Sequence, residues 1–558
     1  MTLPWLSTIV FFPLAGAIAT VLLPARRQGL IRAWATLVAV AEVAITLPLW
    51  WRLDPRQPGW QFAELRSWLP ALGASYSLGV DGVSVLLVLL TVVLTAIAVV
   101  GAYASVEKRS REFYACLLAL EAGMLGTFLA TDVLLFYVFW EAMLIPMYLL
   151  IGVWGGQRRV YAAVKFFLYT MAGSVLMLVA ILSMYFLNRS VMGVSTFALD
   201  AFYRLPIAPA MQTWLFLAFA VAFAIKVPMF PFHTWLPDAH VEAPTAGSVI
   251  LAAVLLKMGT YGFLRFAMPL FPIASAELTP WVVGLAIVGI WYGALVAMVQ
   301  PDLKKLVAYS SVSHLGFCML GLYAMNTQGF TGSLLQMLNH GVSTGALFLL
   351  VGVVYERRHT RLISDFGGLW KPLPVFASIF LVVMLSSVGL PGTNGFVGEF
   401  LVLLGAFRTN PWWAALGAVG VILSAVYMLW MFQRVNYGEV TNPKNRALPD
   451  LTPREWAMMI PTVGLAIVMG VFPNIFLKPM EPSIVSTIDR INGTVTSSSR
   501  REERGGRRGS ALAGSRLAVP NTLSAPAERD PAPLALRASY PAPRSPHRAP
   551  QAAKGGAR

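Results

Sequence analysis

The sequence has few charged residues and very little cysteine for its length. Of its 558 residues, 12% are charged, 57% are hydrophobic and only two are cysteines. Cys116 and Cys318 both fall in apolar runs and have no CxxC partner, so neither a disulfide framework nor a zinc or iron–sulfur site is indicated. No GxGxxG follows a strand pattern and no Walker sequence occurs. We therefore expect no nicotinamide, flavin or ATP site in this chain.

Long apolar runs are present instead. Runs of about twenty residues recur along the chain, and each is long enough to cross roughly 30 Å of hydrocarbon, which excludes a water-soluble fold. The first run, Leu3 to Pro24, has no basic stretch before it and no small-residue cleavage site, so we interpret it as a span and not a signal peptide. We predict an all-α polytopic membrane protein with about fourteen transmembrane helices, near residues 4–24, 30–51, 80–102, 113–130, 133–153, 161–187, 211–227, 243–268, 280–299, 304–325, 329–355, 372–406, 411–433 and 455–477.

The net charge of +16 is concentrated at the end of the chain. From Thr496 onward there are twelve Lys and Arg against four acids, which gives half of the total. This segment is rich in Pro, Ala, Gly, Arg and Ser and lacks hydrophobic periodicity, so we interpret residues 496–558 as a disordered basic tail. A basic interaction arm and a merely solvated tail both remain open. We expect no nucleic-acid partner, because the apolar runs mark a membrane protein and half of the excess charge lies in this tail.

Basic residues alternate between the two sides of the predicted spans. One set of connections holds eighteen of them: Arg26, Arg27, Arg32, Lys108, Arg109, Arg111, Arg158, Arg159, Lys304, Lys305, Arg357, Arg358, Arg361, Lys371, Arg434, Lys444, Arg446 and Arg454. The opposite connections hold six: Arg52, Arg56, Arg66, Arg189, Arg204 and Arg408. The positive-inside rule then predicts that both termini face the outside.

Proline interrupts two spans at membrane depth. Span 7 runs into Lys226–Pro231, and span 12 contains Gly389–Gly392. Each break frees backbone groups that lipid cannot satisfy, so it should be buried in protein or face a watery cavity. The breaks lie five spans apart, and because five is odd, a second five-span unit enters from the other side, as in inverted-repeat transporters. We therefore expect two inverted repeats, formed by spans 4–8 (residues 113–268) and spans 9–13 (residues 280–433). Spans 1–3 occupy residues 1–112, span 14 and a C-terminal segment occupy residues 434–495, and the basic tail occupies residues 496–558.

A row of ionisable residues lies within the spans. In chain order it comprises Glu141, Lys226, Lys257, His314, His340 and Glu399. Each buried charge costs about 2.5 to 3.5 kcal/mol on insertion scales, so an offset is needed. We expect Glu141 to pair with Lys226, since opposite charges stabilise each other in a low dielectric. Each group changes its charge by one proton, and histidine does so near neutral pH, which suits proton transfer.

Structural roles for these residues remain open alternatives. Buried ion pairs also lock helices together, and an intramembrane histidine often bonds a carbonyl. A second polar group follows the break in span 7 and comprises His233, Asp238, His240 and Glu242. An entry funnel, a helix cap and a solvated turn are all open interpretations of this group. Asp302, Lys304 and Lys305 are interpreted as a wet connection.

Several segments resemble one known family. Residues 232–245 read FHTWLPDAHVEAPT, and further blocks read KMGTYG at 257–262, YSSVSHLG at 309–316 and NHG at 339–341. They resemble the antiporter-like subunits of respiratory complex I and of Mrp-type sodium/proton antiporters. The resemblance covers residues 1 to about 490. Glu399, in GLPGTNGFVGEF at 389–400, favours the subunit M (chain 4) branch, because subunits L and N and the Mrp chains typically carry lysine there.

The resemblance implies a proton-translocating membrane subunit of NADH:quinone oxidoreductase, in a bacterial inner membrane. It implies no redox centre in this chain, with NADH, FMN, iron–sulfur clusters and quinone in partner subunits, and membrane-arm partners, especially subunits L and N, besides the lipid bilayer. The implied roles are a coupling acid (Glu141) paired to Lys226, a central relay (Lys257), connecting groups (His314 and His340) and an outer gate or link to the next subunit (Glu399).

Three other functions stay open. The nearest is an Mrp-type sodium/proton antiporter subunit, against which Glu399 argues. The second is a membrane subunit of a ferredoxin- or hydrogenase-linked relative of complex I. The third is a structural scaffold, in which the buried charges only hold helices together.

Overall fold

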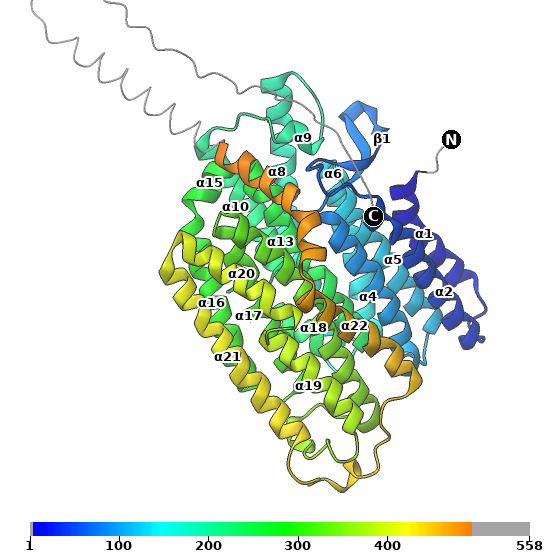
Figure 1. The fold of residues 1–558 in the computed structure, drawn as a ribbon. Coiled ribbons are helices and arrows are strands. Elements are labelled where there is room, and N and C mark those ends of the chain that lie inside the picture. The colour runs from blue at the N-terminus through cyan, green and yellow to red at the C-terminus, as the bar shows by residue number, and fades with distance from the viewer. Residues whose placement is uncertain (1–3, 494–558) are drawn as a thin grey trace, which may run out of the picture. The chain divides into compact units, whose positions relative to one another are not determined.

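The computed structural model describes residues 4–493, which are mostly helical (Figure 1). Thirteen helices in this part are long and apolar enough to cross a membrane. The apolar runs set their positions, since a helix satisfies all backbone polar groups within the segment. These spans are formed by α1 Trp5–Leu22, α2 Gln28–Thr46 with α3 Pro48–Arg52, α4 Ser84–Ser105, α5 Ser110–Leu129, α6 Val133–Ala142 with α7 Leu144–Trp154, α8 Arg159–Met192, α10 Pro209–Lys226, the segment Thr245–Leu270, α16 Thr279–Met298, α17 Leu303–Tyr323, α18 Thr327–Arg358, α21 Pro411–Asn436 and α22 Pro453–Val471.

The two predicted breaks are present. The α10 helix ends at Lys226, and a non-helical turn separates it from α11 (Trp235–Glu242). The predicted span 372–406 consists of two shorter helices, α19 (Pro374–Val388) and α20 (Asn394–Thr409). Gly389 ends α19 with a φ of +87°, a left-handed conformation that glycine adopts without strain. Together with the thirteen longer spans, this broken pair gives the expected helical membrane fold.

One element of the fold was not predicted. Strands β1 (Gln61–Leu69) and β2 (Ala74–Val80) form an antiparallel hairpin in the connection between α3 and α4. The β1 residue Glu64 accepts hydrogen bonds from the backbone N–H groups of Leu6 and Ser7, which are otherwise without partners at the start of α1. The hairpin therefore anchors the N-terminal helix at one end of the bundle, which we name the hairpin end.

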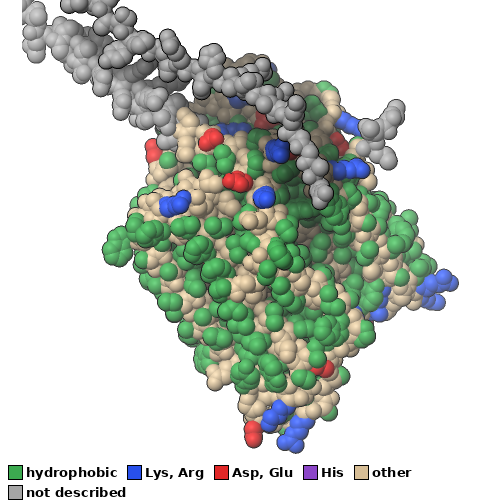
Figure 2. Space-filling view, in the orientation of Figure 1, with side chains coloured by type: hydrophobic (Ala, Val, Ile, Leu, Met, Phe, Trp, Pro, Cys, Tyr) green, Lys and Arg blue, Asp and Glu red, His purple; other side chains and the backbone are tan. Residues whose placement is uncertain are grey.

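Both ends of the described chain lie at the hairpin end. The helix at residues 474–493 follows α22 and lies across that end of the bundle (Figure 1). Its Ser483 side chain hydrogen-bonds the backbone at Gly82 and Pro58, next to the hairpin. The face shown in Figure 2 is mostly hydrophobic between two ends where charged side chains gather, as expected for a membrane protein. The predicted tail at 496–558 lies outside the described residues.

Candidate functional site

Glu141 and Lys226 lie near each other but form no direct ion pair. The Lys226 ammonium group is buried and lies 4.7 Å from the ring centroid of Trp140, the neighbour of Glu141 on α6. Neither Lys226 Nζ nor Glu141 Oε1 has a hydrogen-bond partner among the described residues. The two charges still interact electrostatically, and the Glu141 carboxyl also interacts with Ser174. The expected direct pair is thus wrong for this structure, because the indole ring occupies the place next to the lysine.

Lys257 lies at the centre of a span in which every residue from Ala246 to Leu270 is buried. This span comprises α12 Thr245–Ile250, η2 Leu251–Leu255, α13 Leu256–Gly262, η3 Phe263–Ala267 and α14 Met268–Leu270. The segments η2 and η3 are π-helical, a geometry that often marks functional sites because it disturbs the regular backbone hydrogen bonds. The Lys257 ammonium group donates to the Ala252 carbonyl in η2, at 2.5 Å. The π-helical turn therefore provides a backbone partner for the buried lysine.

Lys257 also contacts the first of two neighbouring histidines. Its Nζ lies 2.5 Å from Nδ1 of His340 on α18. The His340 ring centroid lies 5.8 Å from that of His314 on α17. A polar cavity of about 10 Å³ adjoins both histidines, lined also by Asn339 and Ser387. This volume is close to the minimum for one water molecule, and the polar lining meets the requirement for binding it.

Glu399 completes this second group. Its Oε1 lies 3.1 Å from His314 Nδ1 and accepts a hydrogen bond of 3.0 Å from the Gln336 side-chain amide. The carboxylate is only 4% exposed, although α20 begins directly after the break in span 12. A Cβ at Gly389 would lie 3.0 Å from Glu399 Oε2, so the glycine that ends α19 also makes room for the carboxylate. Lys257, His340, His314 and Glu399 thus form one continuous set of contacts, which we name the Lys257–Glu399 cluster.

The predicted row therefore consists of two parts. The first is the Glu141 and Lys226 pair, and the second is the Lys257–Glu399 cluster. Their helices touch at Gly259 on α13, where a Cβ would lie 2.6 Å from Val227 N and 2.8 Å from the Phe223 carbonyl oxygen of α10. Such an approach is open only to glycine. The two lysines thus lie on touching helices, without a hydrogen bond from Lys226 Nζ to any described residue.

The two histidines after the first break are buried and not solvated. His233 and His240 are 3% and 0% exposed, and their ring nitrogens have no partners within the described chain. His240 stacks on Phe348 at 4.7 Å and interacts electrostatically with Lys257 and Lys304. A solvated turn is therefore excluded for these rings. The acids beside them are engaged elsewhere: Asp238 forms an ion pair of 2.8 Å with Lys165, and Glu242 accepts a hydrogen bond from the Arg158 backbone.

The segment around Asp302 is more ordered than the expected wet connection. Asp302 caps α17 by accepting hydrogen bonds from the backbone N–H groups of Lys304 and Lys305, and it pairs with Arg361 at 3.3 Å. Lys304 is 5% exposed and donates to the Ala243 carbonyl, just before the span of Lys257. Lys304 thus adds a buried cation that the sequence interpretation missed.

Two buried acids were also missed. Glu42 on α2 and Glu121 on α5 are both 0% exposed, and they interact electrostatically with each other. Thr46 donates to Glu42 Oε1, while neither carboxylate oxygen of Glu121 has a partner among the described residues. The signal was an acid inside an apolar run, the same signal that revealed Glu141. Within residues 4–493, no three His, Cys, Asp or Glu side chains are grouped so as to hold a metal ion.

Comparison with known proteins identifies the family. The family model described as NADH:quinone oxidoreductase/Mrp antiporter, TM, matches residues 130–426. NADH-quinone oxidoreductase subunit M from Rhodobacter capsulatus is 48% identical over 87% of this chain and 96% of its own length. NADH-ubiquinone oxidoreductase chain 4 from Chondrus crispus is 40% identical over 86% of this chain and 97% of its own.

A solved structure supports the same assignment. A chain in the structure of respiratory complex I from Thermus thermophilus with bound NADH is 35% identical to this chain. The match has a TM-score of 0.80 and covers 87% of this chain and 99% of that one. The predicted resemblance to the subunit M branch is confirmed, and the chain belongs to the antiporter-like membrane subunit family of NADH:quinone oxidoreductases and Mrp antiporters.

Proposed function

We propose that this chain translocates protons as a membrane subunit of an NADH:quinone oxidoreductase, driven by electron transfer from NADH to quinone in partner subunits. The carrying observation is the Lys257–Glu399 cluster, in which four titratable side chains from four helices follow one another within the membrane-spanning bundle. Each can gain or lose one proton. A purely structural ion pair needs two such groups, whereas a proton path needs a series.

Proton transfer requires the two parts of the row to communicate. Lys226 is the last residue of α10, directly before the break, and Glu141 supplies the nearby negative charge. When Glu141 moves away, the buried ammonium ion loses electrostatic stabilisation and tends to release its proton. The receiving group is Lys257, whose helix touches α10 at Gly259. His340 and His314 then carry the proton toward Glu399, which gates the exit or links to the next subunit.

The inverted repeats are part of this proposal. Asp132 caps α6 at the start of span 5, and Asp302 caps α17 at the start of span 10, five spans later. Each forms an isolated antiparallel bridge with the connection that follows the next long helix, at Ala198 and Leu362 respectively. Asp132 binds Ser75 of the hairpin, which places it at the hairpin end. Five spans, an odd number, separate Asp132 from Asp302, so Asp302 lies at the opposite end of the bundle. The two aspartate caps with their bridges therefore occur at opposite ends, as inverted topology requires.

The chain's surroundings follow from the same proposal. The membrane is a bacterial inner membrane, with both termini on the outer face, in keeping with the basic residues of the opposite connections. The partners are membrane-arm subunits, especially the antiporter-like subunits L and N. NADH, FMN, iron–sulfur clusters and quinone belong to other subunits.

The test of this assignment is the set of proteins that remains with the chain in mild detergent. We expect mass spectrometry to identify NADH- and quinone-reducing subunits together with subunits L and N. Hydrogenase or ferredoxin-linked subunits, or Mrp chains with sodium exchange in reconstituted vesicles, would contradict it.

A further inference from the structure

Two buried acids lie outside both the Glu141 and Lys226 pair and the Lys257–Glu399 cluster. Glu42 on α2 and Glu121 on α5 are each 0% exposed, and they interact electrostatically with each other. The helices α2 and α5 pack against each other and against α1 and α4, at one side of the bundle (Figure 1). Two groups that can carry the same charge are therefore placed together inside the membrane-spanning part.

Three of the four carboxyl oxygens of these acids lack a hydrogen-bond partner. Glu42 Oε1 accepts a hydrogen bond of 2.9 Å from the Thr46 hydroxyl, one turn further along α2. Glu42 Oε2 and both oxygens of Glu121 have no partner among the described residues. A carboxylate only accepts hydrogen bonds, whereas a protonated carboxyl group also donates one. A proton on one acid would therefore supply a donor for the other.

The helices around the pair carry no basic residue at its level. In the first seven helices and their connections, the basic residues nearest in sequence to the acids are Arg32, Arg52 and Arg111, each ten residues from Glu42 or Glu121. Ten residues correspond to about 15 Å along a helix axis. Within the described chain, Glu121 has no electrostatic partner other than Glu42. Two ionised carboxylates would repel each other here without a countercharge, so one acid of the pair keeps its proton.

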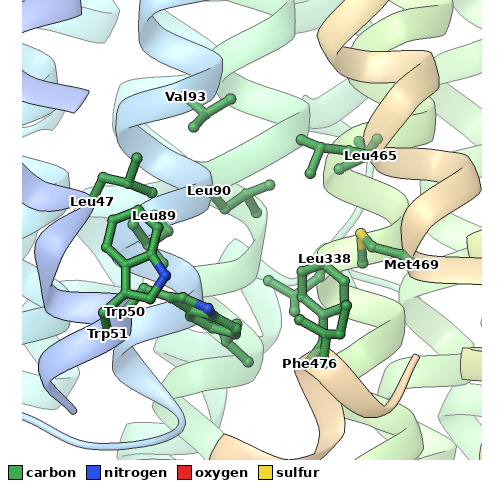
Figure 3. A pocket seen from close by; sticks show the side chains of 13 residues that line it. Leu47, Trp50, Trp51, Leu89, Leu90, Val93, Leu338, Leu465, Met469 and Phe476 are labelled. Carbon is green, nitrogen blue, oxygen red and sulfur yellow. The ribbon is translucent and has the colours of Figure 1, made fainter. Parts of the chain in front are cut away.

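The space beyond α3 and α4 supplies no countercharge either. A groove of about 320 Å³ separates these helices from α18 and α22, with Leu47 and Leu90 on one side and Met469 on the other (Figure 3). Leu47 directly follows Thr46, the hydrogen-bond donor to Glu42. None of the described residues that line this groove is acidic or basic.

The α5 helix separates the pair from Glu141. A Cβ at Gly123 of α5 would lie 2.7 Å from Met143 Cγ, so this side of α5 packs on the segment that carries Glu141. Glu121 precedes Gly123 by two residues, which places it about 200° around the helix axis, on the side away from Glu141. A proton bound between Glu42 and Glu121 therefore lies outside the contacts that begin at Glu141.

We propose that Glu42 and Glu121 form a proton-binding site in which Glu121 is a neutral carboxylic acid and Glu42 is a carboxylate. Glu42 is the charged partner because Thr46 already donates to it, whereas Glu121 has no such donor. The proton lets Glu121 donate to Glu42, so that two hydrogen bonds stabilise the single remaining charge. The site does not depend on proton translocation through the Lys257–Glu399 cluster.

Infrared spectroscopy of the purified complex in a sodium-free potassium buffer tests the protonation state, because carboxylic acids and carboxylates absorb in separate bands. Subtracting the Glu121→Gln spectrum from the wild-type spectrum should reveal one carboxylic-acid band, since the new amide still donates to Glu42 and keeps it ionised. Glu42→Gln should retain this band at a shifted frequency, because the hydrogen-bond acceptor of Glu121 has changed. Glu112→Gln, at an ion pair of roughly one-third exposed side chains on α5, should remove only carboxylate bands.

Three spectroscopic results would overturn the proposal. A Glu121→Gln difference with only carboxylate bands would show that Glu121 is ionised. A carboxylic-acid band lost in Glu42→Gln but kept in Glu121→Gln would place the proton on Glu42. A band that disappears when sodium is added to the wild type would identify a sodium site in place of a proton site.

Proton translocation by Glu121→Gln tests whether the site lies outside the path. The number of protons moved per NADH oxidised should equal that of the wild type, since the variant changes no residue of the Lys257–Glu399 cluster. A lower ratio would show that the Glu42 and Glu121 pair belongs to the translocation path and would contradict its separate role. The infrared result stands independently of which residues translocate protons.

Discussion

Lys257 and His340 are 83 residues apart in the chain, yet the lysine Nζ lies 2.5 Å from the histidine Nδ1. At this distance a proton can pass directly between the two nitrogens. The contact depends on two local features: the π-helical turn, whose Ala252 carbonyl also binds the lysine, and the glycine at position 341, which lets α18 approach the span of Lys257. This contact begins the Lys257–Glu399 cluster.

Glu141→Ala should abolish proton translocation while the complex stays assembled. The substitution removes the negative charge that stabilises Lys226 but leaves Trp140, which holds the lysine side chain in place. Proton uptake by vesicles and the subunit composition of the purified complex are the two measurements. Glu112→Ala, at an ion pair of roughly one-third exposed side chains, is the control and should pump normally. Normal pumping by Glu141→Ala would refute its role.

The contact between His314 and Glu399 predicts non-additive effects. His314→Gln and Glu399→Gln should each slow translocation by roughly tenfold or more, about 1.4 kcal/mol, because each interrupts the same path. The double variant should be little slower than the slower single one, since an interrupted path gains nothing from a second interruption. The measurement is the proton translocation rate of the wild type, both single variants and the double variant, at equal amounts of complex. The idea of a shared proton path would be wrong if the free-energy effects of the two substitutions on the translocation rate simply add. It would also be wrong if Ser378→Ala, on the exposed face of α19, slows translocation equally.

A buried ion pair at the hairpin end should dominate local stability. Arg265 donates two hydrogen bonds, of 2.8 and 2.7 Å, to the Asp81 carboxylate, and the side chains are only 7% and 2% exposed. Asp81→Asn leaves a buried guanidinium without its counter-charge, which costs about 3 to 5 kcal/mol. Arg111→Gln breaks an ion pair whose side chains are about one-third exposed, and it should cost at most about 1 kcal/mol. Thermal unfolding in detergent compares the Asp81→Asn and Arg111→Gln variants. Equal unfolding midpoints would contradict a dominant role of the Asp81–Arg265 pair in local stability.

The repeat proposal predicts matched losses at two distant caps. Asp132→Ala and Asp302→Ala each remove a side chain that accepts two backbone N–H bonds at a helix start, which costs about 0.5 to 2 kcal/mol. Hydrogen exchange should rise in the first turns of α6 and α17 respectively. Exchange that rises for one cap alone would show that the two positions are not equivalent.

The sequence predicted the spans, both breaks and the residues of the row because these depend on local properties. The length of an apolar run indicates a membrane-spanning helix, and a proline within it indicates a break. An ionisable residue inside an apolar run can be recognised from the sequence without knowledge of its neighbours in the fold. Glu42 and Glu121 carried that last signal equally clearly and were missed, so their omission reflects the interpretation and not the physics.

The remaining features depend on contacts between distant segments. The indole of Trp140 reaches Lys226 only after α6 and α10 pack together, which is why a direct Glu141 pair was expected wrongly. The π-helical segments that flank Lys257 have no distinct residue pattern, because ordinary helix formers adopt them under tertiary packing. The hairpin was missed because its first strand, Gln61–Leu69, mixes polar and apolar residues without strict alternation.

The most direct test of the account is the number of protons moved per NADH oxidised by the reconstituted complex that carries Lys257→Met. Methionine keeps the length and apolar stem of the side chain but carries no proton, so the complex should assemble with its helices in place. We predict that the ratio falls in Lys257→Met, while Lys305→Met, an exposed lysine outside the cluster, keeps the full ratio. An unchanged ratio in Lys257→Met would show that protons do not pass through the Lys257–Glu399 cluster.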